Sequence, residues 1–199
     1  DPKGLLLSSI FDDNPVVFLE HRWLHNQEGD VPEGDVREPL GKAKLLRKGN
    51  DLSIVSMSYM TVEALHAVTY LESQGISCDV IDLRSISPLD WEMVFSSVKK
   101  TSRLLVLDTG VATGSVAGEI VARVSMDLFS YLKQAPKRLT LPDFPTPTSP
   151  ALTDNFYIRS EHIIQQVGKM MNKKISTESL TLQRKFPNDV PGDWFRGPF

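Results

Sequence analysis

The sequence predicts an α/β fold, a three-layer α/β/α domain around a mostly parallel five-stranded sheet with one antiparallel edge strand. Short runs rich in Val, Ile and Leu alternate with segments whose apolar residues recur every three or four positions. The short runs are apolar at consecutive positions, as in strands that helices cover on both faces. Strands that alternate with helices imply right-handed crossovers and therefore a largely parallel sheet.

The strands are expected where these apolar runs lie. Four of them are predicted over residues 52–58, 78–85, 103–109 and 136–143. A fifth, over 42–49, is separated from the 52–58 strand only by Gly49-Asn50-Asp51, which is typical of a hairpin turn. We therefore expect these two strands to pair and to form the antiparallel edge.

The helices are expected between the strands and after the last one. They are predicted over 61–73, 88–100, 116–131 and 158–171. The first is followed by Gly75, which tolerates the positive φ of a helix C-terminus. For the second, Ser87 is the predicted N-cap and Pro88 the first helical residue.

The two ends of the chain differ in character from the predicted α/β domain, which spans 40–172. Residues 1–25 contain a short helix and a strand-like run that belong to no unit visible here, and 26–39 have the Gly and Pro content of a linker. The extension over 173–199 carries three phenylalanines and a tryptophan, and we expect it to pack on its own domain. A partner-binding role for the extension is the alternative. Because the first residue is not methionine, we expect a fragment of a longer protein.

Composition limits the kinds of partner. The formal net charge of -3 gives no electrostatic basis for binding nucleic acid or an anionic membrane. A single cysteine, Cys78, excludes an internal disulfide and fits the cytoplasm. No run approaches the roughly 20 apolar residues of a membrane-spanning helix. Small molecules and other proteins are the expected partners.

The strand-like run PVVFLEH ends in a polar cluster. His21 and His25 are four residues apart, a spacing that suits metal ligands on a helix but not after a strand. Glu20 lies where open α/β sheets often place functional groups, although pairing with Arg22 or a backbone amide is the favoured interpretation. We expect no metal site here, and interpret the cluster as a domain edge.

The glycine-rich segment over 108–118 follows a strand and opens a helix, which is the position of phosphate-binding loops. The spacing of Gly110, Gly114 and Gly118 matches neither common nucleotide-binding motif, and no lysine follows. A tight turn and close helix packing are favoured, with nucleotide binding as the alternative.

Asp82 and Arg84 stand at the end of the 78–85 strand, where we expect an ion pair that fixes the following loop. Ser115, His66, His162 and Cys78 form no recognisable nucleophile, acid or base arrangement. From the residues alone, we expect no catalytic, cofactor-binding or metal-binding residues in this chain.

Several segments together resemble the beta subunit of thiamine-diphosphate-dependent 2-oxo acid dehydrogenases. In chain order they are IFDDNPVVFLEH, VPEG, PLGKAKLLRKGNDLSIVSMSYMTVEALHA, GISCDVIDLRSISPLD, VKKTSRLLVLD and, after the glycines, AGEI, which includes Glu119. The resemblance runs from about Lys3 to Met171 and covers the part of the subunit called the transketolase C-terminal domain.

The resemblance implies roles for the parts of the chain. Residues 1–25 would close an upstream pyrimidine-binding domain, and the rest would serve subunit assembly. Glu20, Asp82, Arg84, Gly110, Gly114, Gly118 and Glu119 would be structural or assembly residues. Thiamine diphosphate and Mg would belong to the full enzyme and would not bind this fragment alone.

The resemblance also implies partners and an activity. The partners would be an alpha subunit, a second beta subunit in a dimer, and a lipoyl acyltransferase core. The full enzyme would oxidatively decarboxylate pyruvate or a branched-chain 2-oxo acid and transfer the acyl group to lipoyl, in the cytoplasm or the mitochondrial matrix of a eukaryote. The isolated fragment is expected to be inactive. The alternatives are a nucleotide-binding domain that uses the 108–118 loop and another transketolase-family C-terminal domain.

Overall fold

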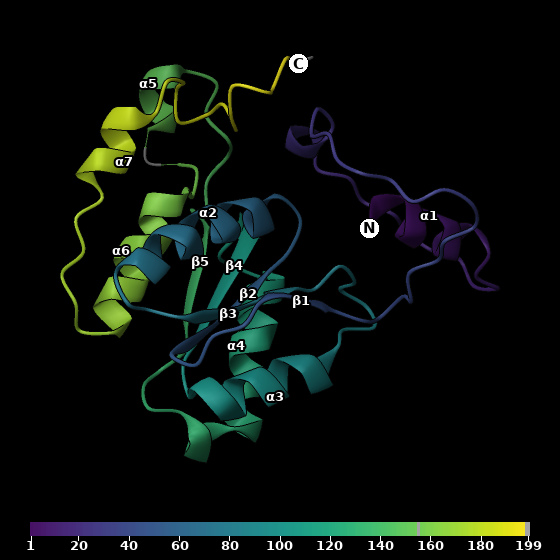
Figure 1. Cartoon of the computed structure of the whole chain (residues 1–199), viewed down its shortest axis with the longest axis horizontal. Helices are drawn as coiled ribbons and strands as arrows, with labels where there is room; N and C mark the ends of the chain where they lie inside the picture. The colour runs from purple at the N-terminus through teal and green to yellow at the C-terminus, as the bar shows by residue number, and fades with distance from the viewer. Residues whose placement is uncertain (155, 198–199) are drawn as a thin grey trace.

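A computed structural model describes residues 1–154 and 156–197 of the chain and shows a five-stranded sheet between two layers of helices (Figure 1). Its strands are β1 (Lys44–Arg47), β2 (Leu52–Ser56), β3 (Cys78–Asp82), β4 (Leu104–Val111) and β5 (Lys137–Leu141). Their order is β1-β3-β2-β4-β5, with β1 antiparallel to β3 and every other pair parallel. The predicted fold class is confirmed.

The predicted hairpin between the first two strands is wrong. β1 pairs with β3, with Lys44 opposite Asp82, and β2 lies at the centre of the sheet. Both edges of β2 are occupied by its parallel neighbours β3 and β4, and all of its residues are buried. The connecting turn instead docks at the start of β3, where the Gly49 N–H donates to Asp79 (2.9 Å).

Two helices cover each face of the sheet. The main helices are α2 (Tyr59–Ser73), α3 (Trp91–Thr101), α4 (Val116–Asp127) and α6 (Ser160–Met170). Successive strand residues point to opposite faces, so Ile54 packs with α2 and α6, whereas Val55 packs with α3 and α4. Alternate residues of each strand therefore contribute to two separate hydrophobic cores, one on each face of the sheet.

Helix α3 begins three residues later than predicted. Its N-cap is Asp90, whose carboxylate accepts from the Met93 N–H (3.2 Å), and not Ser87. The same carboxylate accepts from the Ala43 N–H (3.0 Å) and so ties the helix to the segment before β1. Helix α4 ends at Asp127, and a short 3-10 turn over Phe129–Tyr131 completes the segment that was predicted as one helix.

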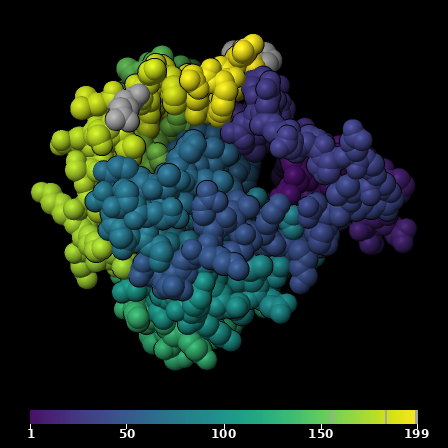
Figure 2. All heavy atoms as spheres, in the orientation of Figure 1, coloured from purple at the N-terminus to yellow at the C-terminus, as the bar shows by residue number. Residues whose placement is uncertain are grey.

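The N-terminal residues project from the α/β body (Figures 1 and 2). They contain α1 (Pro2–Ile10) and a 3-10 turn over Arg22–Leu24. The strand predicted within 15–21 is absent from the described part of the chain, because no neighbouring strand lies beside it. Val17 and Leu19 are left 84% and 82% exposed.

The C-terminal extension packs on its own domain, as predicted. It follows α6 through α7 (Glu178–Gln183), with the short α5 (Pro150–Thr153) nearby (Figure 1). Arg184 forms an ion pair with Glu161 of α6 (2.5 Å), and the guanidinium of Arg159 lies over the Phe186 ring. Phe199 and its neighbour lie outside the described residues.

Within residues 1–154 and 156–197, every helix is too short or too polar to cross a membrane.

Candidate functional site

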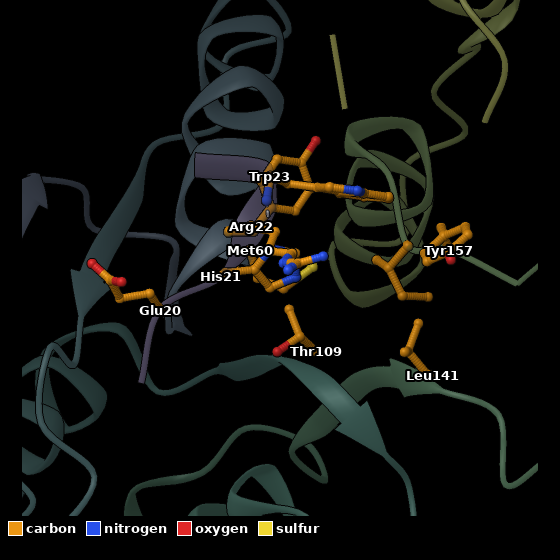
Figure 3. Close-up of a pocket in the computed structure, with 10 residues that line it drawn as sticks. Glu20, His21, Arg22, Trp23, Met60, Thr109, Leu141 and Tyr157 are labelled. Atoms are coloured by element: carbon orange, nitrogen blue, oxygen red, sulfur yellow. Dashed lines mark hydrogen bonds between the residues drawn. The ribbon is translucent and has the colours of Figure 1, made fainter. Parts of the chain in front are cut away.

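A pocket of about 340 Å³ opens at the carboxyl edge of the sheet (Figure 3). After the central strand β2, the chain forms β3 on one side of it and then β4 on the other side. The strand order therefore reverses direction between β2 and β4. Open α/β sheets bind ligands at this point. The lining residues are Glu20, His21, Arg22, Trp23, Tyr59, Met60, Thr109, Leu141, Tyr157 and Ile158.

Segments that are far apart in the chain build the walls, and one of them contains Tyr157 and Ile158. Tyr59 and Met60 begin α2 directly after β2, while Thr109 and Leu141 lie at the ends of β4 and β5. The N-terminal segment forms the opposite wall, where Trp23 packs edge-on against Tyr59 at a centroid distance of 5.0 Å. The pocket therefore exists only because the N-terminal segment folds back onto the sheet.

His21 is held in one orientation. Its Nδ1 accepts from the Trp23 N–H (3.2 Å), and its ring stacks on Tyr59 at 5.5 Å. Burial, and then the charge of His25, lower the pKa of His21 from its ordinary value. The ring is consequently neutral at pH 7, and because Nδ1 accepts, the proton is on Nε2.

A buried ion pair lies behind the aromatic wall. Arg159 bonds Glu63 (3.0 Å), and the two side chains are only 2% and 4% exposed. The guanidinium also donates to the Tyr59 hydroxyl (2.7 Å) and to the carbonyl of Val190 (2.7 Å) in the C-terminal extension. Glu63 additionally accepts from the Tyr59 hydroxyl and from the Ser160 N–H (2.7 Å). The cluster thus fastens α2, the start of α6 and the extension to one another.

The glycine-rich loop is closed on itself. The carboxylate of Asp108 accepts from the Gly110 N–H (2.8 Å) and the Ala117 N–H (3.0 Å). Ser115 is the N-cap of α4 and accepts from the Gly118 N–H (3.0 Å). The amides of Gly110, Ala117 and Gly118 are therefore already bonded, and Asp108 places a negative charge beside them, which is unfavourable for a nucleotide phosphate.

The glycines of this loop have conformational and packing roles. Gly114 has a φ of +74°, which disfavours a side chain, and a Cβ at Gly118 would come within 2.9 Å of the Arg138 guanidinium. Arg138 in turn donates to the carbonyl of Ala112 (2.8 Å). These contacts favour the interpretation of a tight turn with close packing.

The predicted ion pair between Asp82 and Arg84 is replaced by another arrangement. The Arg84 guanidinium bonds Glu38 (2.8 Å) and the carbonyl of Lys42, whereas the Asp82 carboxylate accepts from the Arg84 backbone N–H (3.4 Å) and the Thr61 hydroxyl (3.3 Å). The positive φ of Arg84 (54°) turns its side chain toward the linker. Burial therefore dominates at Asp82 and raises its pKa.

The remaining predicted residues lie apart. Glu20 approaches His25 (3.9 Å) rather than Arg22, and Glu119 is an exposed residue on α4 beside a second groove that also includes Trp91 and Arg123. Among the described residues, no three histidine, cysteine or carboxylate side chains are grouped to hold a metal ion. Cys78 is buried, which raises the pKa of its thiol to about 12.

The sequence did not identify the pocket residues Tyr59 and Thr109 or the buried pair of Glu63 and Arg159. Arg159 follows the apolar run Phe156-Tyr157-Ile158, which is a weak local signal, and nothing local links it to Glu63, 96 positions away in the printed sequence. Together, the site and the fold define an α/β domain with a pocket at the carboxyl edge of its sheet.

The comparisons with known proteins assign the family. The sequence model of the family called transketolase, C-terminal domain matches residues 41–163, and the chain belongs to this family.

The curated relatives of this chain are beta subunits of two kinds of enzyme. The chain is 39% identical over 171 residues to the beta subunit of acetoin:2,6-dichlorophenolindophenol oxidoreductase from Cupriavidus necator. It is 40% identical over 173 residues to the subunit of the same name from Bacillus subtilis. It is 38% identical over 177 residues to the beta subunit of the pyruvate dehydrogenase E1 component from Porphyra purpurea. These matches cover 86%, 87% and 88% of the chain but 51%, 51% and 54% of the relatives.

A solved structure shows the same architecture. The structure is that of a split-gene transketolase, described as an inactive tetramer of beta subunits (beta4). It matches with a TM-score of 0.61 and 25% identity, over 74% of this chain and 48% of the transketolase chain. The chain therefore spans about half the length of both the curated relatives and this structural neighbour.

Proposed function

We propose that this chain is the C-terminal half of the beta subunit of a thiamine-diphosphate-dependent dehydrogenase of the pyruvate or acetoin type. The observation that carries the proposal is the 38–40% identity to such beta subunits over nearly nine tenths of the chain. In this role the chain is an assembly module, and turnover requires the other parts of the enzyme.

The start of α4 does not fit the diphosphate of thiamine diphosphate, and the described carboxylates do not fit its metal. The N-terminus of α4 is capped by Asp108 and Ser115, and no cluster of acidic residues could hold Mg among the residues described. In this proposal the cofactor and its metal are held by parts of the enzyme outside this chain.

Division of the chain follows from the resemblance. Residues 1–25 would close an upstream pyrimidine-binding domain, 26–39 would link it to the domain over 40–172, and 173–199 would be an extension. The exposed Val17 and Leu19 fit this division, because an upstream sheet would cover them. Glu20, Asp82, Arg84, Gly110, Gly114, Gly118 and Glu119 would then maintain the fold or the assembly.

The partners proposed are an alpha subunit and a second beta subunit, and a lipoyl acyltransferase core is a further one. The names of the relatives support the first, since each is a beta subunit. The substrate class is a 2-oxo acid or acetoin, and the cytoplasm or the mitochondrial matrix is the proposed location.

A chimera tests the proposal. The matching half of the Bacillus subtilis beta subunit is replaced by this chain and expressed with the corresponding alpha subunit, thiamine diphosphate and Mg. We expect acetoin-dependent reduction of 2,6-dichlorophenolindophenol. A chimera that folds, as judged by its melting transition, but does not associate with the alpha subunit would overturn the proposal.

A further inference from the structure

The pocket at the carboxyl edge presents two polar groups without partners. Within residues 1–154 and 156–197, nothing hydrogen-bonds to Nε2 of His21 or to the hydroxyl of Thr109, and both side chains line the pocket. The bond from the Trp23 amide fixes Nε2 of the neutral ring as a donor, and a hydroxyl can donate or accept. A ligand therefore meets a fixed N–H donor on one side and an adaptable hydroxyl on the other.

The rest of the lining is aromatic and apolar. Tyr157 and Trp23 lie 4.9 Å apart and form one wall, and Met60 and Leu141 also line the pocket (Figure 3). Such a wall favours a flat aromatic ring, which can stack on the side chains and contact the methionine sulfur. The volume of about 340 Å³ falls within the range of about 300–1,000 Å³ that small-molecule sites occupy.

Charge at the rim is balanced. Glu20 and Arg22 carry opposite signs, and His21 is neutral at pH 7. Neither an anion nor a cation gains a clear electrostatic advantage, so a neutral ligand is favoured. The N–H donor further favours a ring that carries an acceptor nitrogen.

From these features we propose that the pocket between the start of α2, the ends of β4 and β5, residues 157–158 and the N-terminal segment binds a neutral, planar heteroaromatic ring such as a purine base. The His21 Nε2–H donates to a ring nitrogen, Thr109 bonds a second polar group, and the aromatic wall stacks on the ring. This site does not depend on the dehydrogenase assignment. It uses the side chain of Thr109 in the 108–118 segment but not the loop amides, of which those of Gly110, Thr113, Ala117 and Gly118 are already bonded.

Adenosine is the probe, titrated into the ¹⁵N-labelled chain and followed by NMR. We expect the indole N–H signal of Trp23 to shift in a saturable way, while the indole of Trp91, at the start of α3 on the other face of the sheet, does not move. Thr109→Val should weaken the affinity by about three- to tenfold, since it removes one hydrogen bond at nearly constant shape. The same replacement at the exposed Thr69 of α2 is the matched control and should leave the affinity unchanged.

A second variant and a second probe distinguish specific binding of adenosine from nonspecific binding of a flat ring to the apolar wall. His21→Phe keeps the ring that stacks on Tyr59 but removes the donor, and should weaken adenosine by a similar factor. Indole, a flat ring without an acceptor nitrogen, should bind more weakly than adenosine to the wild-type chain. The proposal is overturned if adenosine leaves Trp23 unmoved at millimolar concentration, if it moves the amides of 110–118 instead, or if neither variant weakens it.

Discussion

Replacing Arg159 with methionine removes the positive half of the buried ion pair and leaves the carboxylate of Glu63 without its charge partner. Glu63 is 4% exposed and cannot turn to water without moving α2. Removing one partner of a buried pair typically costs about 3–5 kcal/mol, because the remaining charge is desolvated and uncompensated. For a chain of this length, 1 kcal/mol corresponds to a shift of roughly 2–4 °C in Tm. We therefore expect Arg159→Met to lower Tm by about 6–20 °C.

Urea unfolding followed by circular dichroism measures this cost directly. Glu63→Gln combined with Arg159→Met should be more stable than Arg159→Met alone, since the double variant buries a neutral amide instead of a charge. Asp127→Asn breaks the exposed pair with Arg123 and serves as the control, with an expected change within about 0.5 kcal/mol. If Arg159→Met costs less than about 1 kcal/mol, or if the double variant is no more stable than it, the assigned role of the ion pair is refuted.

Three further predictions concern pH, a turn and the single thiol. Burial lowers the pKa of His162 below its ordinary value of 6.5, so the native state resists protonation and stability should fall as the pH drops from 6.5 through the folded pKa. His162→Gln keeps an acceptor for the backbone N–H of Arg159, the N-cap of α6, but does not titrate. Its urea midpoint should fall less between pH 7.5 and pH 5, and an equal fall contradicts the assignment. A Cβ at Gly49 would overlap backbone atoms of Ser77 and Cys78, so Gly49→Ala should lower the free energy of unfolding by about 1–3 kcal/mol. Gly29→Ala is the control, because a Cβ there has no neighbouring atom within 4 Å. Equal urea midpoints for the two variants would disprove the prediction. The buried Cys78 thiol, with its pKa of about 12, should react with a thiol reagent at pH 8 only after unfolding, and rapid labelling of the native chain would show otherwise.

The sheet was predictable because its signal is local. Consecutive apolar residues in β2, β3 and β4, separated by amphipathic helices, define strands covered on both faces. The partner of β1 was not predictable in this way. The turn over 49–51 resembles a hairpin locally, but the position beside β2 is taken by β3, whose pairing depends on residues about 25 positions further along the chain.

The candidate site was mostly hidden from sequence reasoning for the same reason. The glycine loop was correctly interpreted as a tight turn, because the unsuitable spacing of its glycines is a local property. The pocket instead joins His21, Tyr59, Thr109 and Tyr157 from four separate segments, and no local pattern brings them together. Arg84 was placed in a predicted pair with its sequence neighbour, yet its positive φ directs the side chain to Glu38.

The central claim is that this chain is an assembly half whose chemistry requires the rest of the enzyme. The most direct test is dye reduction by the purified chain alone, with thiamine diphosphate and Mg, using pyruvate and acetoin as separate substrates. The account predicts no turnover above that of the heat-denatured chain. Sustained reduction of 2,6-dichlorophenolindophenol by the chain alone would contradict it and would mean that these residues form a complete active site.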